Sequence, residues 1–142
     1  MAEELHSLIR LYRWGVDEKR RQLGELLRHL ADLENQGVRL GEELLNEQHA
    51  AGASPGEAGY LYGYYAEAVI MRREKIAEAS AETEERIAAA REELNEAYRE
   101  LKKYEIAQEN REKAEARELS LKEQADLDEL GIKGFIRKRQ RA

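Results

Sequence analysis

The chain has 142 residues, of which 38% are charged and 6% aromatic, with one proline and no cysteine. Its bias toward alanine, glutamate, lysine, leucine and arginine is typical of long helices rather than packed layers. The lack of cysteine excludes disulfide and thiolate chemistry, and the net charge of −6 argues against a general nucleic-acid binder. No apolar run reaches the roughly 20 residues that a membrane helix needs, so no membrane insertion is expected.

Residues 4–48 are expected to form a first long helix. Their apolar residues step alternately by four and three positions, which is the a/d seam of a coiled coil. Only Lys19 and Gly37 interrupt the series. A helix in a globule would drift off this period, because 3.6 residues per turn do not match 3.5 over several heptads. The seam positions are Leu5, Ile9, Tyr12, Val16, Leu23, Leu26, Leu30, Leu33, Leu40 and Leu44.

A turn is expected over residues 49–54, close to the only proline of the chain. Ser54, Pro55 and Glu57 have the spacing of a helix cap, which predicts a second helix over about 55–130. The seam of this helix is weaker, because three of its thirteen positions are polar. These positions are Tyr62, Ala66, Val69, Arg73, Ile76, Ser80, Thr83, Ile87, Ala90, Leu94, Ala97, Leu101 and Tyr104.

A short turn between two heptad helices makes them antiparallel neighbours. Folding about residue 53 sets Leu5 opposite residues 101–104, where the second seam also ends. The expected fold class is therefore all-α: a long antiparallel two-helix coiled-coil hairpin with an extended C-terminal helix, forming one domain over residues 1–142. A parallel dimer of two bent chains would have the same periodicity and stays an alternative.

Residues 105–130 overshoot the first helix, and their apolar spacing is poor. They hold nine acidic and four basic residues. If helical, the overhang would extend about 35 to 40 Å, at about 1.5 Å per residue. Such a helix buries little, so it is either frayed or ordered by a partner. The basic tail at residues 131–142 fits a nucleic-acid or nuclear signal, but its charges also suit the end of a helix dipole.

No catalytic, cofactor or metal site is expected, and the chain is predicted not to be an enzyme. His6, His29 and His49 are too far apart for the paired histidines of a helical metal site. The glycines between residues 52 and 63 lack the lysine and following hydroxyl of a phosphate-binding loop.

Trp14 is predicted to point away from the seam, with Arg10, Asp17 and Arg21 on neighbouring turns. A single exposed tryptophan among arginines has the composition of a binding hot spot. Alternatively, the C-terminal arm folds back and covers Trp14 as a third helix.

Four of the seven tyrosines fall within residues 60–65. A second apolar stripe, facing outward, is predicted beside them, and it stops after two turns. A patch this local suggests docking of a partner. Alternatively, it packs against the turn or lies in a dimer contact. The stripe consists of Leu61, Tyr64, Ala68 and Met71.

Three stretches of the chain resemble a known family. They are residues 8–21 (LIRLYRWGVDEKRR), residues 100–111 (ELKKYEIAQENR) and residues 128–135 (DELGIKGF). Together with the length of the chain, they resemble the flagellar export protein FliJ family, the coiled-coil subunit of the flagellar type III secretion ATPase complex.

The resemblance implies a non-enzymatic part of the bacterial flagellar type III export apparatus, cytoplasmic and peripheral at the flagellar basal body. The implied partners are a hexameric export ATPase, bound and stimulated by a central stalk, an export-gate membrane protein and export chaperones. The end with both termini would enter the ATPase ring, and the outward patch would meet the gate. The implied ATPase contacts are Arg10, Arg13, Trp14, Arg21, Tyr104, Asn110 and Phe135, and the implied gate contacts are Leu61, Tyr64, Ala68 and Met71.

Two other classes of function fit the same residues. A generic structural coiled coil could self-associate through its long arms, and a nucleic-acid-associated coiled coil could use the basic tail. The acidity of the chain argues against the second.

Overall fold

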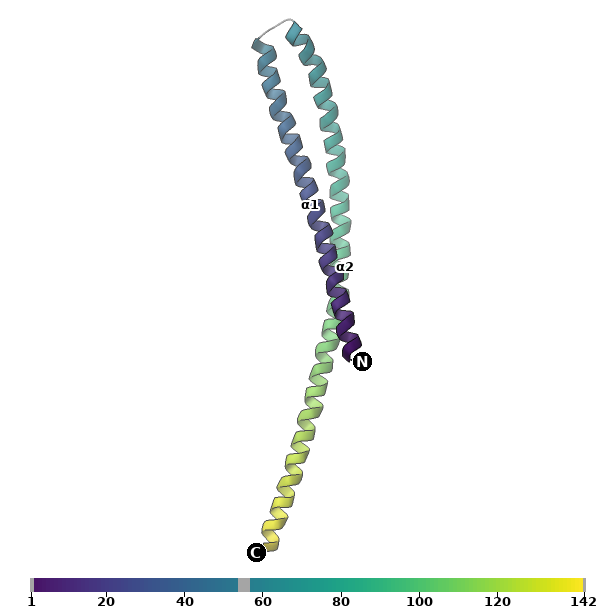
Figure 1. The fold of residues 1–142 in the computed structure, drawn as a ribbon, viewed down its shortest axis with the longest axis vertical. Helices are drawn as coiled ribbons and strands as arrows, with labels where there is room; N and C mark the ends of the chain where they lie inside the picture. Colours follow the sequence, from purple (N-terminus) through teal and green to yellow (C-terminus); the bar gives the residue numbers. More distant parts are fainter. Residues whose placement is uncertain (1, 54–56, 142) are drawn as a thin grey trace. The chain divides into compact units, whose positions relative to one another are not determined.

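The computed structural model describes residues 2–53 and 57–141, with side chains described for residues 3–52 and 61–141. Two helices account for these residues: α1, Ala2–Ala53, and α2, Glu57–Arg141. The two helices pack against each other and run in opposite directions (Figure 1). The predicted all-α class, an antiparallel helical hairpin with a long second helix, is confirmed.

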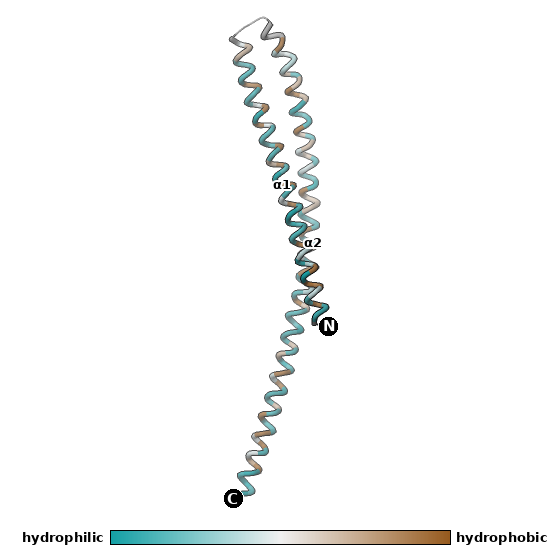
Figure 2. The backbone as a smooth tube through the Cα atoms, in the orientation of Figure 1, coloured by the Kyte–Doolittle hydropathy of each residue, from teal (hydrophilic) through white to brown (hydrophobic). Residues whose placement is uncertain are grey.

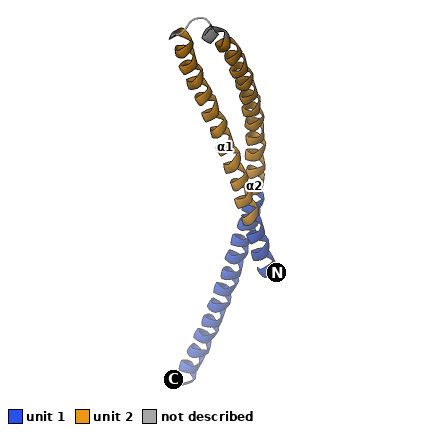
Figure 3. Ribbon diagram, turned by 45° about the horizontal axis from the view of Figure 1, so that its top comes forward, with its two compact units in different colours: residues 1–13, 99–142 blue, residues 14–98 orange. Residues whose placement is uncertain are grey.

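The chain divides into two compact units, which Figure 3 colours separately. Unit 2, residues 14–98, is a helical hairpin whose two helical segments lie side by side. Unit 1 consists of residues 1–13 and residues 99–142. In this unit the first turns of α1 pair with the part of α2 that begins at residue 99. The organisation as one domain stays a prediction.

The core of unit 2 follows the predicted seams. Val69 is the most deeply buried side chain, with 1% of its surface exposed. Every predicted seam residue of this unit is buried or half-buried except Arg73, and Figure 2 shows the apolar positions recurring along both helices among polar ones. Burying a large aliphatic side chain contributes about 1.5 to 3 kcal/mol. The buried seam positions are Val16, Leu33, Leu40, Val69, Thr83 and Ile87.

Two polar seam positions of α2 are accommodated in different ways. The hydroxyl of Thr83 donates a hydrogen bond of 2.7 Å to the carbonyl oxygen of Ala79, one turn earlier, so its burial leaves no unsatisfied donor. The side chain of Arg73 is exposed. Its guanidinium lies 3.0 Å from where a Cβ on Gly41 would be, so the missing side chain of the glycine gives the arginine room to reach water.

The core of unit 1 is smaller. Ile9 of α1 and Leu101 of α2 are its buried apolar residues. Beside them the rings of Tyr12 and Tyr104 stack, with their centroids 4.8 Å apart and their planes inclined by 27°. Aromatic pairs of this kind contribute about 0.5 to 1.5 kcal/mol beyond their burial. This stack fixes the pairing of the two helices in unit 1.

Both helices are longer than their predicted bounds. The structure continues α1 through residues 49–53, where a turn was predicted, because alanines surround the single Gly52 and alanine is the strongest helix former. It also continues α2 through Gly131 and Gly134 to Arg141. Neither glycine has the positive φ with which a helix usually ends. The cap predicted at residues 54–56 lies outside the described residues.

The predicted register of the two helices is wrong by about one to two turns. His6, the neighbour of Leu5, contacts Gln108 at 3.0 Å, whereas Leu5 was expected opposite residues 101–104. The pairing therefore does not stop at Tyr104, because Gln108 and Arg111 are half-buried as well. The physical reason is that α1 extends to Ala53, so the chain reverses direction later in the sequence than predicted.

Candidate functional site

The longest exposed surface of the chain is the part of α2 that follows the paired helices of unit 1. Every residue from Glu112 to Arg141 is exposed, and we call this segment the exposed arm. It carries several large apolar side chains in water, which is a mark of a binding surface. These are Leu119, Leu121, Leu127, Leu130, Ile132, Phe135 and Ile136.

The apolar residues of the exposed arm occupy two opposite faces. At about 100° per residue, Leu121 and Ile132 lie on one side of the helix, and Leu127 and Leu130 lie on the other. Charged residues lie between the two faces and also on them, as Asp128 does beside Ile132 and Glu123 beside Leu130. A helix with a single partner needs only one apolar stripe. Two opposite stripes suit a helix that is contacted from more than one side.

Local ion pairs support the exposed arm as a helix. Lys113 pairs with Glu109 at 3.2 Å, and Lys133 pairs with Glu129 at 3.4 Å, both at the favourable spacing of four residues. Exposed pairs of this kind contribute about 0.3 to 0.5 kcal/mol each. They favour helix in a segment without tertiary packing, but they are too weak to make it rigid.

A polar groove of about 330 Å³ lies where the two helices of unit 1 meet. Gln108 is at its centre, and its Nε2 lies 3.0 Å from the ring nitrogens of His6 and donates to Glu112 at 3.2 Å. The Oε1 of Gln108 is buried without a hydrogen-bond partner in the described part of the chain. This oxygen is closed off from solvent inside the groove, so it is an unsatisfied acceptor of the helix pair. The groove is lined by His6, Ile9, Arg10, Arg13, Glu105, Gln108, Glu109 and Glu112.

The predicted ATPase contacts are divided between the units. In unit 1, Arg10 and Arg13 line the polar groove, where Arg13 pairs with Glu105 at 3.5 Å. No ion pair of the described residues involves Arg10, which leaves its charge available to a partner.

Tyr104, Asn110 and Phe135 also belong to unit 1, but they are not brought together. Tyr104 is half-buried in the stack with Tyr12, so its ring packs the helices. Asn110 and Phe135 are exposed on one helix, 25 residues or about 37 Å apart along its axis. Phe135 therefore belongs to a surface of its own.

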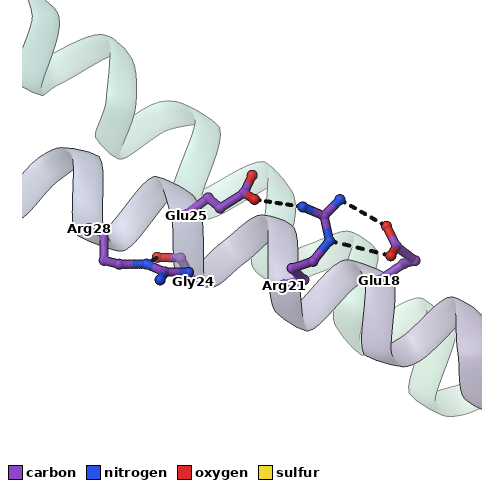
Figure 4. Close-up of polar contacts among 5 residues, drawn as sticks. All are labelled: Glu18, Arg21, Gly24, Glu25 and Arg28. Atoms are coloured by element: carbon purple, nitrogen blue, oxygen red, sulfur yellow. Dashed lines mark hydrogen bonds and ion pairs between the residues drawn. The ribbon is translucent and has the colours of Figure 1, made fainter.

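Trp14 and Arg21 belong to unit 2. Trp14 is 64% exposed, so the outward orientation predicted for it is confirmed. The guanidinium of Arg21 is held by Glu18 and Glu25 on adjacent turns (Figure 4). Its hydrogen bond to Glu18 lowers the pKa of that carboxyl below its ordinary value. A partner must break these contacts to bind Arg21, whereas Trp14 is accessible without such a change.

The predicted gate contacts form one exposed face of α2 in unit 2. Leu61, Tyr64, Ala68 and Met71 are all exposed, and their steps of three, four and three residues keep them on one side of the helix. Their outward orientation is confirmed. Tyr65 turns inward beside them, and burial together with Glu43 and Glu47 raises its pKa above the ordinary value.

Sequence reasoning missed a second groove, of about 380 Å³, in unit 2. Its apolar floor is formed by Leu40 and Ile76, and its rim holds Arg39, Arg72 and Lys75. The sequence did contain a signal, because Gly37 breaks the seam there. A Cβ on Gly37 would lie 4.0 Å from Ile76, so the missing side chain leaves space between the helices.

The described residues contain no helix that is long and apolar enough to cross a membrane. They also contain no group of three or more His, Asp or Glu side chains that could hold a metal ion. The described surfaces present exposed apolar faces, two grooves and an unpaired arginine, Arg10.

Comparison with known proteins agrees with this reading. No curated protein and no solved structure matches the chain. The sequence profile of the family described as "Flagellar FliJ protein" matches residues 1–140. Because this match covers nearly the whole chain, the protein belongs to the flagellar FliJ protein family and is a structural component of the flagellar export apparatus.

Proposed function

We propose that this chain binds the hexameric flagellar export ATPase as its central stalk and stimulates ATP hydrolysis. The observation that carries the proposal is the exposed arm, residues 112–141, a helix with apolar residues on two opposite faces. A stalk inside a ring is contacted from several sides, which is the environment that such a helix needs. Family membership supports the setting, the flagellar export apparatus.

The polar groove of unit 1 gives this contact its specificity. The charge of Arg10 has no carboxylate partner among the described residues, and the buried Oε1 of Gln108 accepts no hydrogen bond there. A ring subunit that offers a carboxylate would satisfy Arg10, whereas the buried oxygen of Gln108 is reached only if the groove opens. Hydrogen bonds to charged groups contribute about 1.5 to 3 kcal/mol, so Arg10 is the arginine on which binding should depend most.

The exposed face of unit 2 has a separate role in this proposal. The exposed residues Leu61, Tyr64, Ala68 and Met71 bind the export-gate membrane protein, and the chain also contacts export chaperones. The stalk thus joins soluble and membrane components from a peripheral position on the cytoplasmic side of the basal body. It performs no chemistry itself and acts on catalysis through the ATPase.

A titration tests the stalk role. Purified chain is added to the export ATPase of the same organism, and the rate of ATP hydrolysis is followed against chain concentration. We expect stimulation that saturates near one chain per six ATPase subunits. No stimulation, combined with an average mass that rises with concentration, would replace the stalk by a self-associating scaffold.

Arg10→Glu is the variant that tests the contact, because it reverses a charge without breaking an ion pair of the described chain. Reversal of Arg13 or Arg21 would also disturb their contacts with Glu105, Glu18 and Glu25. We expect Arg10→Glu to raise the concentration needed for half-maximal stimulation at least about tenfold. Arg91→Glu, on an exposed position of unit 2, is the matched control and should stimulate normally. Equal behaviour of the two variants would contradict the assigned contact.

A further inference from the structure

The last three turns of α2 differ in composition from the rest of the exposed arm. Residues 131–141 hold five basic residues and no acidic residue, whereas residues 105–130 hold nine acidic residues. Three large apolar side chains, Ile132, Phe135 and Ile136, are 62%, 65% and 48% exposed among these charges. The stalk role does not by itself explain why these opposite properties are combined in so short a segment.

The helix separates most of the basic side chains from the apolar ones. At about 100° per residue, Ile132, Phe135 and Ile136 fall within an arc of about 100°. Lys133, Arg137, Lys138 and Arg141 lie outside that arc and cover the remaining surface. Arg139 lies within the same arc one turn after Phe135, so the apolar face ends there. We call residues 131–141 the amphipathic end.

Most of the positive charge at the amphipathic end is unpaired. Lys133 pairs with Glu129 at 3.4 Å. The other four basic residues of this segment have no carboxylate within 4.0 Å in the described part of the chain. They are Arg137, Lys138, Arg139 and Arg141.

We propose that the amphipathic end binds the surface of a membrane that contains anionic lipids. Ile132, Phe135 and Ile136 enter the boundary between headgroups and acyl chains, and the basic side chains contact the lipid phosphates. A helix that lies in this boundary needs an apolar face beside a cationic one, not a membrane-spanning length. Asp128, one turn before Ile132, sets the limit of the lipid contact because its charge is repelled by anionic headgroups.

The apolar face decides among the possible anionic partners. Nucleic acid would use the basic residues through its phosphates, but it would leave Phe135 and both isoleucines in water. The acidic residues 112–129 of a second copy would satisfy the charge, but their large apolar residues, Leu119, Leu121 and Leu127, are divided between two opposite faces. A lipid surface satisfies both sides of the helix at once. The proposal assigns a lipid contact to the last part of the arm that the stalk role also uses, and its test needs no ATPase.

The test is flotation of the full chain with lipid vesicles. We expect binding to phosphatidylcholine vesicles that contain about 30% phosphatidylglycerol, and none to pure phosphatidylcholine vesicles. Binding should weaken as salt rises from about 0.1 M to 1 M, where the screening length falls from about 10 to 3 Å. Equal binding to both kinds of vesicle, or to neither, would overturn the proposal.

Three variants separate lipid binding from simple charge attraction. Phe135→Glu should weaken vesicle binding at least about tenfold, because it removes the largest apolar group and adds a negative charge. R137Q/R141Q should weaken it about twenty-five-fold, since each basic residue near the surface contributes about fivefold. R117Q/K122Q removes two charges elsewhere on the exposed arm, and we expect it to bind as wild type. Circular dichroism checks that all variants stay helical.

The same variants identify the competing partners. Vesicle binding that survives Phe135→Glu would show attraction by charge alone and would overturn the interfacial contact. A mass that rises with chain concentration and is lowered by R137Q/R141Q would instead identify a second copy as the occupant. Retention on DNA that exceeds vesicle binding and is unaffected by Phe135→Glu would identify a nucleic acid.

Discussion

Tyr12 and Tyr104 are the aromatic residues that join the two helices of unit 1. Their rings stack 4.8 Å apart, and a hydrogen bond with Tyr104 raises the pKa of Tyr12 above 10.0. The charge that Tyr104 and Glu100 place nearby and partial burial act in the same direction. Each of these effects disfavours the phenolate, so the contact depends on Tyr12 staying neutral.

This dependence predicts how stability changes in alkaline solution. A pKa that is higher in the folded state stabilises the fold fully below the unfolded value of 10.0, and this stabilisation is lost as pH rises through the folded pKa. We expect the Tyr12→Phe variant to be less stable than the wild type at pH 8, because the hydrogen bond is lost. Above about pH 10 the stability of the variant should depend less on pH than that of the wild type. The midpoint of urea unfolding between pH 8 and 11 measures both effects. The variant changes no other side chain, so parallel curves would show that Tyr12 is not the sensitive group.

At the scale of the element, α1 combines a strong seam with glycines in a long helix. Gly15 and Gly37 illustrate two different situations in unit 2. A Cβ added to Gly15 would meet nothing within 4 Å, whereas a Cβ added to Gly37 would lie 4.0 Å from Ile76, which is ordinary contact. Each glycine costs the helix about 1 kcal/mol relative to alanine, but only Gly37 also leaves space in the seam.

We therefore expect both Gly15→Ala and Gly37→Ala to stabilise unit 2, and Gly37→Ala to do so more. Helix propensity contributes up to about 1 kcal/mol to each free energy of unfolding. The added methyl at residue 37 contributes packing against Ile76 as well. Urea unfolding followed by circular dichroism gives the comparison. If Gly37→Ala destabilises unit 2 while Gly15→Ala does not, the helices lie too close together at residue 37 to hold an added methyl group.

Much of the fold could be predicted because the seam is a property of spacing. The heptad pattern identified the buried positions Ile9, Val16 and Val69 without knowledge of the partner helix. It could not give the register, because an antiparallel seam repeats every heptad and the reversal was placed several residues too early. Only particular contacts, such as that of His6 with Gln108, distinguish one register from the next.

The candidate site could be predicted only in part. The seam determines which residues point outward, so the exposure of Trp14 and Met71 followed from the sequence. The partners of long charged side chains did not follow, because several carboxylates lie within reach of each arginine. Arg21 bridges Glu18 and Glu25, and Arg13 reaches Glu105 across the helix pair. Such choices depend on side-chain conformations, which heptad spacing does not encode.

At the scale of the whole molecule, tertiary support is distributed unevenly along the chain. Residues 61–111 of α2 include buried or half-buried side chains on nearly every turn, whereas every described residue from Glu112 onward is exposed. Isolated helices in water are marginally stable, and exposed ion pairs add only about 0.3 to 0.5 kcal/mol each. Local opening should therefore be much easier in the exposed arm than in the paired segments.

Amide hydrogen exchange tests this difference directly. In the free chain we expect residues 114–141 to exchange orders of magnitude faster than residues 66–104, because nothing packed against the arm opposes its opening. A partner that binds the arm must supply the missing contacts, so saturating ATPase should slow exchange there while leaving residues 66–104 almost unchanged. The measurement is repeated at two chain concentrations to detect self-association. Slow exchange of the arm in the free chain at both concentrations would contradict this prediction, because it would require packing within the chain that the exposed positions from Glu112 onward do not provide.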